Sequence, residues 1–135
     1  MAFIDWEDKY RINVAEVDRQ HKGLFDILNR LHQSVISGED KSMQSVILDD
    51  LIDYTVEHFA TEEKMFKETG YPGYENHKEV HDDLTRQAVN IQNEFRNDNA
   101  TISFDLLDFL NEWLTTHTLG LDQEAGDFLN SKGIF

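Results

Sequence analysis

Residues 77–95 read HKEVHDDLTRQAVNIQNEF, and this stretch decides the fold. It begins with His77 and His81 and continues into an apolar stripe with the same steps of four and three residues. The stripe consists of Leu84, Ala88, Ile91 and Phe95. These steps place successive side chains on one face of an α-helix, so we predict an amphipathic helix with two inward-facing histidines.

Three further segments, each about 20 residues long, show the same helical period. Their apolar faces carry Leu24, Leu28, Leu31 and Val35; Ile47, Leu51, Tyr54 and Met65; and Leu106, Leu107, Leu110, Trp113 and Leu114. Clusters of helix-breaking residues separate the four segments at 37–40, 69–73 and 97–99. Short connections favour antiparallel neighbours, so the sequence predicts an all-α, up-down-up-down antiparallel four-helix bundle.

The chain of 135 residues has the size of one domain. We predict an N-terminal arm over residues 1–17, which packs along a bundle over residues 18–135. Asp18 is the expected N-cap of the first helix, because a short acidic side chain there can accept from free backbone N–H groups.

The composition excludes several classes of site and partner. The chain has 12 basic and 27 acidic residues, a formal net charge of −15, and no cysteine. Such a charge repels nucleic acid and anionic membranes, and the lack of cysteine excludes disulfides, thiolate metal sites and iron–sulfur clusters. The N-terminus does not resemble a signal peptide and no apolar run is long enough to span a bilayer, so we expect a cytoplasmic protein.

Polar residues with metal-binding side chains interrupt the predicted apolar faces. They are His21, His58, Glu62, His77, His81 and His117. A buried carboxylate such as Glu62 is costly unless it is paired or bound to metal. No inward lysine or arginine on these faces is available to neutralise it, so a metal ion is the natural partner.

The positions of these residues along the four helices predict that they meet. In an antiparallel pair, residues equally far from the turn lie at the same height. The midpoints of the pairs His21/His58, Glu62/His77 and His81/His117 fall within the three breaker clusters. All four helices should therefore bring their histidines to one level near one end of the bundle.

Asp122 can join this set only if the last helix is distorted. It follows His117 by five residues, which in a regular helix is an offset of about 140°. We predict a one-residue π-bulge between the two residues, and we expect Gly120 to permit it.

Taken singly, each of these residues has an ordinary structural explanation, and a lone His-x-x-x-His pair is weak evidence for a metal. Their common height favours the metal site. His32 serves as an internal control, because it lies about 16 Å along the helix from His21 and should be structural. Glu63 is set aside because it points about 140° away from His58.

Five imidazoles and two carboxylates exceed what one tetrahedral zinc ion uses. Seven donors suit two octahedral ions bridged by carboxylates, and iron is the natural dinuclear choice. The Glu-x-x-His motif of carboxylate-rich di-iron bundles is absent from the sequence. Neutral imidazoles stabilise highly oxidised iron less well, which favours reversible O2 binding over O2 activation.

Over essentially its whole length the chain resembles the bacteriohemerythrins, the prokaryotic single-domain hemerythrin family. The matching motifs are Asp18-Arg19-Gln20-His21-Lys22, His58-Phe59-Ala60-Thr61-Glu62-Glu63, Gly70-Tyr71-Pro72, His77-Lys78-Glu79-Val80-His81, and Trp113-Leu114-Thr115-Thr116-His117 with Asp122. The chain departs locally at Thr118-Leu119-Gly120, where the family often has a larger aliphatic residue directly after the histidine. That departure concerns pocket shape and autoxidation rate, not metal binding.

The resemblance implies two iron ions per chain with an oxo or hydroxo bridge, and O2 as the ligand. It implies that His77, His81 and His117 hold one iron, that His21 and His58 hold the other, and that Glu62 and Asp122 bridge them. O2 then binds at the open position of the two-histidine iron. Expected lining residues of the O2 pocket are Leu24, Phe25, Leu28, Phe59, Trp113 and Leu114.

The expected function is non-enzymatic, reversible O2 binding for storage, transport or delivery. Two alternatives remain at this point: a di-iron enzyme that reduces peroxide or nitric oxide, and a module that senses O2 or handles iron. We expect a monomer with no nucleic-acid partner and no membrane insertion.

Overall fold

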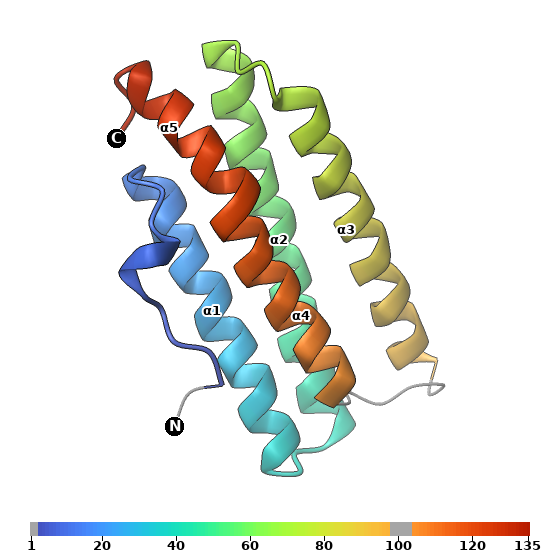
Figure 1. Ribbon diagram of the computed structural model, residues 1–135. Coiled ribbons are helices and arrows are strands. Elements are labelled where there is room, and N and C mark those ends of the chain that lie inside the picture. The colour runs from blue at the N-terminus through green and yellow to red at the C-terminus, as the bar shows by residue number, and fades with distance from the viewer. Residues whose placement is uncertain (1–2, 98–103) are drawn as a thin grey trace.

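The computed structural model describes residues 3–97 and 104–135. Its long helices are α1 (Ala15–Ile36), α2 (Lys41–Thr69), α3 (Tyr74–Arg96) and α4 (Phe104–His117), and a π-helical turn, Thr118–Asp122, joins α4 to α5 (Gln123–Ser131). In Figure 1, α1, α2, α3 and α4 lie side by side along a common direction, and α5 continues the line of α4. The predicted all-α four-helix bundle is confirmed, and no strand occurs in these two ranges.

The turns between the helices have the backbone features that the breaker clusters predict. Gly38 and Gly70 both adopt a left-handed conformation with φ of 69°, which ends α1 and α2. Asp40 caps α2, because its side chain accepts from the Met43 backbone N–H at 3.0 Å. Asp98 and Asn99, in the third cluster, lie outside the described residues.

Helix α1 begins earlier than predicted, and the N-cap assignment of Asp18 is wrong. The helix starts at Ala15 after Val14, whose backbone is extended, and Asp18 already lies in its first turn. The Asp18 carboxylate instead accepts from the Ile12 backbone N–H at 2.8 Å. It therefore joins the arm to the first turn of the helix.

Residues 3–14 form an arm that packs along the bundle. The predicted arm of residues 1–17 is too long at its C-terminal end, because Ala15–Val17 already belong to α1. Asn29 exchanges two hydrogen bonds with the Ile4 backbone, each 2.8 Å long. Trp6 and Tyr10 of the arm contact the ring of Phe25 edge-on, with centroid distances of 5.3 and 5.1 Å. The arm therefore runs alongside α1 up to the N-terminal end of the helix (Figure 1).

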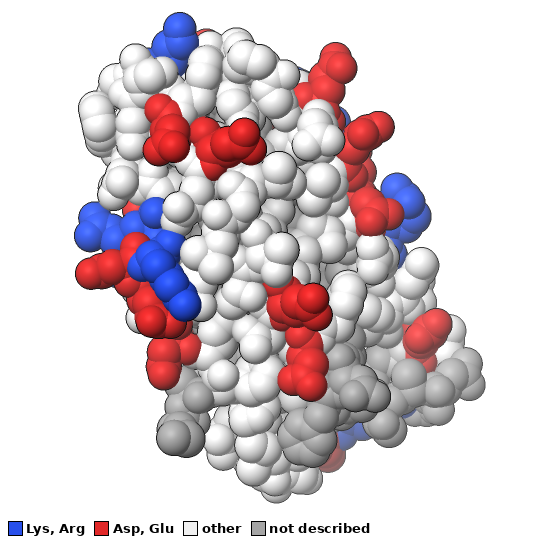
Figure 2. Space-filling model, in the orientation of Figure 1, with Lys and Arg blue, Asp and Glu red and all other residues white. Residues whose placement is uncertain are grey.

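The outer surface reflects the acidic composition. Figure 2 shows acidic side chains spread over the drawn face, with basic side chains beside some of them at both edges. None of the described helices is both long enough and apolar enough to cross a membrane.

The arm also packs closely against α5 at Gly126. A Cβ added to this residue would lie 2.6 Å from the carbonyl oxygen of Ile12, and this backbone atom cannot move without shifting the arm. At an exposed position inside a helix, changing glycine to alanine stabilises the protein by about 1 kcal/mol. We expect Gly126→Ala to have the opposite sign and to cost about 1–3 kcal/mol in the free energy of unfolding.

Chemical denaturation checks this prediction, with Gly120→Ala as the matched control. A Cβ at Gly120 would meet nothing within 4 Å, so that variant should unfold like the wild type or later. Equal stability of Gly126→Ala and the wild type would contradict the close approach of arm and helix.

Candidate metal centre

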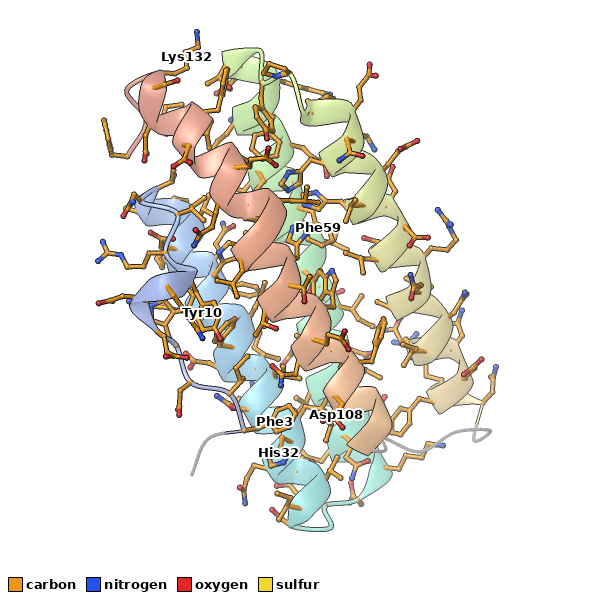
Figure 3. The ribbon with its side chains drawn as sticks, viewed as in Figure 1. Phe3, Tyr10, His32, Phe59, Asp108 and Lys132 are labelled. Atoms are coloured by element: carbon orange, nitrogen blue, oxygen red, sulfur yellow. The ribbon has the colours of Figure 1, made fainter. Side chains whose placement is uncertain are left out.

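Seven inward-facing side chains from four helices meet at one level of the bundle. His21 comes from α1, His58 and Glu62 come from α2, and His77 and His81 come from α3. His117 ends α4 and Asp122 ends the π-helical turn. All seven side chains are buried, with at most 6% of any residue exposed. Figure 3 labels Phe59, which lies at the level of the seven side chains, and His32, which lies near the opposite end of α1.

The seven residues fall into two overlapping groups. One consists of Glu62, His77, His81, His117 and Asp122, and the other consists of His21, His58, Glu62 and Asp122. Within each group, one nitrogen or oxygen atom from every residue lies within 4.8 Å of the others. Both groups share the two carboxylates, which is the arrangement needed to hold two ions side by side.

The π-helical turn, Thr118–Asp122, brings Asp122 into the site. A π-turn has more residues per turn than an α-helix, so it returns the fifth residue to the starting face. Asp122 Oδ1 consequently lies 2.9 Å from His117 Nε2. The predicted distortion is present and Gly120 lies inside it, but neither the φ of Gly120 nor the space around its Cβ position requires glycine.

Close approaches within the site do not satisfy the buried polar atoms. Asp122 lies 2.9 Å from each Nε2 of His21, His77 and His117, and Glu62 contacts the His58 ring. Several buried atoms nevertheless have no hydrogen-bond partner among the described residues: Nε2 of His21, His58 and His77, and all four carboxylate oxygens of Glu62 and Asp122. Isolated, such atoms destabilise a fold. Their concentration at one point fits a metal site, since imidazole and carboxylate are suitable ligands for iron.

The electrostatics of the metal-free site are dominated by the two carboxylates. Burial alone would lower the pKa of His21 and His77, but Asp122 and Glu62 raise these pKa values to about 10 and about 9. Burial alone would raise the pKa of Glu62 and Asp122, but the surrounding imidazoles hold both well below the usual range. Burial lowers the pKa of His81 to about 3, so that imidazole stays neutral. Protonated His21 and His77 thus supply the positive charge that the metal-free site needs.

The raised pKa values predict a pH dependence of stability in the metal-free protein. A histidine whose folded pKa exceeds its unfolded value of about 6.5 stabilises the fold fully below that value. This contribution is lost as the pH rises through about 9 for His77 and about 10 for His21. We therefore expect the free energy of unfolding of metal-free protein to fall between pH 7 and pH 10.

Denaturant unfolding at a series of pH values checks this prediction, with iron-loaded protein as the control. Metal binding requires unprotonated imidazole. His21 and His77 of the iron-loaded protein therefore carry no additional proton that could be lost as the pH rises. Metal-free stability that is constant or rises over this pH range would contradict the charge assignment.

Two polar residues outside the seven contact the outer nitrogens of the histidines. Gln20 Oε1 lies 2.8 Å from His58 Nδ1, and Glu63 Oε2 lies 3.1 Å from His81 Nδ1. The helical pattern does not single out Gln20, although its position directly before His21 on α1 is a signal that could have found it. Glu63 does point away from His58, but it reaches a histidine of the neighbouring helix α3.

The residues expected to line an O2 pocket lie in two different surroundings. Leu24, Leu28, Trp113 and Leu114 line an enclosed apolar chamber. Phe25 and Phe59 do not line this chamber. Phe25 contacts the arm, and the ring of Phe59 stacks on His81 with a centroid distance of 3.8 Å.

Comparison with known proteins agrees with this site. Residues 13–128 match the family model of the hemerythrin HHE cation-binding domain. A bacteriohemerythrin of Stenotrophomonas maltophilia is 35% identical over 94% of this chain and 82% of its own length. A bacteriohemerythrin of Methylococcus capsulatus is 34% identical over 97% of this chain and all of its own.

The fold comparison gives the same result. The crystal structure of a wild-type hemerythrin superposes with a TM-score of 0.90 at 34% identity, covering 95% of this chain and 98% of that one. The buried histidine and carboxylate cluster, the sequence match and the shared fold agree: this chain belongs to the hemerythrin family.

Proposed function

We propose that this protein binds O2 reversibly at two non-haem iron ions held by the seven buried side chains. His77, His81 and His117 are proposed to hold one ion, and His21 and His58 the other. Glu62 and Asp122 are proposed to bridge them. The single observation that carries this assignment is the division of the site into two groups that share both carboxylates. When bound, the iron pair supplies the electrons that reversible O2 binding requires.

The unequal number of imidazoles supports one position for O2. The three-histidine group has one more protein donor than the two-histidine group. The position with fewer donors is therefore the one proposed to accept O2. The shared carboxylates carry two negative charges in a fully buried site, which favours retention of the cations.

The enclosed chamber supports an apolar ligand next to this position. It has a volume of about 30 Å³. Four of its lining residues lie three positions from a site histidine, one on each helix: Leu24, Thr55, Leu84 and Leu114. Three residues of helix span about 4.5 Å, so the chamber begins about one turn below the proposed ions.

The chamber also disfavours water and protons. Among the described residues that line it, only Thr55 and Trp113 carry polar side-chain atoms. The Thr55 hydroxyl donates to the Leu51 carbonyl at 2.7 Å, and the buried Nε1 of Trp113 has no hydrogen-bond partner in the described part of the chain. A water molecule needs about two to four polar partners to occupy a cavity, and this lining offers at most one free donor, so the chamber should stay dry. A dry lining without ionisable groups supports release of unchanged O2, since reduction of O2 to water requires protons.

Repeated oxygenation tests the proposal. Protein loaded with ferrous iron under anaerobic conditions should gain a visible absorption band in air and lose it on degassing, over several cycles. One O2 should be taken up per two irons. Irreversible bleaching on the first exposure would contradict the proposal.

The same preparation distinguishes a carrier from the enzymatic alternative. With added reductant and either peroxide or nitric oxide, a carrier should turn over no faster than an equal concentration of free iron. Turnover far above that of free iron would assign the chain an enzymatic role.

A further inference from the structure

The outer nitrogens of two site histidines have partners of different charge. His58 Nδ1 faces the amide oxygen of Gln20 at 2.8 Å, and His81 Nδ1 faces the carboxylate of Glu63 at 3.1 Å. Both partner atoms are acceptors, so both histidines must donate from Nδ1. A ring that donates from Nδ1 can bind a metal ion through Nε2, which faces the interior of the site.

The orientation of the Gln20 amide is fixed by two further contacts. Its Nε2 donates to Glu16 Oε1 and to Thr61 Oγ1, both at 3.2 Å. Thr61 donates its own hydroxyl proton to the Glu57 carbonyl at 3.1 Å, so its oxygen is left to accept from Gln20. The Gln20 oxygen must then face His58.

Glu63 lies in a different electrostatic setting. Its side chain is about one-fifth exposed, and Lys78 Nζ lies 3.9 Å from its second oxygen. A carboxylate that accepts from an imidazole N–H makes the imidazole a stronger electron donor to a bound metal, and more so than a neutral amide. Stronger donation stabilises the higher oxidation state of an ion.

We propose that Gln20 and Glu63 are positioning residues that make the two metal positions unequal. This inference rests on the proposed function, because it requires iron at both positions. Through His81, Glu63 makes the three-histidine position the better site for ferric iron. Through His58, the neutral Gln20 leaves the two-histidine position, where O2 is proposed to bind, more favourable for ferrous iron.

Reciprocal isosteric substitutions test this assignment. Anaerobic redox titration with mediators, which supply and accept the electrons, gives the midpoint potential of the iron-loaded protein. Glu63→Gln should raise the potential, since the ferric ion loses a charged supporting group. Gln20→Glu should lower it. Loss of an outer-shell partner costs about 10–100-fold in metal affinity, and a tenfold loss confined to the ferric state equals a rise of about 59 mV.

Two matched controls separate this effect from net charge. Glu68→Gln and Gln33→Glu make the same exchanges at exposed positions of α2 and α1 and should leave the potential unchanged. Shifts of Glu63→Gln and Gln20→Glu in the same direction, or shifts no larger than the controls, would overturn the proposal. Wild-type protein that takes up no iron would overturn both this inference and the proposed function.

Nitrogen NMR of the metal-free protein provides a readout that needs no iron. His58 and His81 should each carry a proton on Nδ1. An Nδ1 without a proton on either ring would contradict the hydrogen bonds from which the inference starts, even where O2 binding itself is observed.

Discussion

His77→Ala should reduce the iron content from two ions per chain to one or fewer. His77 Nε2 lies 2.9 Å from Asp122 and 3.4 Å from Glu62, so its loss removes a donor beside both shared carboxylates. The ring is also 99% buried against Phe66, and its removal leaves a cavity. A ligand present at one hundred times its dissociation constant stabilises a fold by about 2.7 kcal/mol, so the loss of metal lowers stability further. Elemental analysis and thermal unfolding measure both effects.

His32→Ala is the matched control for this variant. His32 stacks on Phe3 with a centroid distance of 4.3 Å near the far end of the bundle. Its removal should cost about 0.5–1.5 kcal/mol of stability and leave two ions per chain. Equal loss of iron from both variants would contradict the placement of the site at one level.

Asp122→Asn should have the larger effect on metal content, with fewer than one ion retained per chain. The carboxylate lies within 2.9 Å of three imidazoles and belongs to both groups of the site. Asparagine has nearly the same shape but offers one oxygen, and its NH2 group is not a metal ligand. Both ions should therefore lose a bridging atom and a compensating charge.

The Asp122→Asn variant also has an expected signature without metal. The Asp122 carboxylate contributes to the raised pKa of His21 and His77, so both pKa values should fall in the metal-free variant. Asp127→Asn, an exposed acid five residues later, should change neither iron content nor these titrations. Two ions retained by Asp122→Asn would show that Asp122 is not a bridging ligand.

The sequence predicted how the site residues converge because that convergence depends on helix geometry alone. Antiparallel helices of equal rise bring residues equally far from a turn to the same height, so the pairs around the turns could be matched by counting. The five-residue spacing of His117 and Asp122 likewise required a wide turn if both face inward. The structure has that turn at Thr118–Asp122.

Contacts that depend on how one helix is rotated against another could not be predicted in this way. The helical period gives the direction of Glu63 relative to His58 on the same helix, but not its distance from His81 on α3. The pairing of Gln20 with His58 depends similarly on the side-chain conformations of α1 and α2. Asp18 looked like a cap because the sequence does not show that Val14 and the arm already define the helix start.

The role of Gly120 illustrates a different limit. Glycine in a distorted turn suggests a backbone that other residues cannot adopt, but this turn has ordinary right-handed helical dihedrals at both flanking residues. A residue other than glycine could therefore occupy position 120 of this turn. Iron content of Gly120→Ala should accordingly equal that of the wild type.

Anomalous diffraction at the iron absorption edge, on crystals of protein loaded with iron without oxygen, tests the central claim most directly. The account predicts two peaks in the interior of the bundle, one within reach of His77, His81 and His117 and the other within reach of His21 and His58, with Glu62 and Asp122 between them. A single peak, or peaks away from these seven side chains, would contradict it.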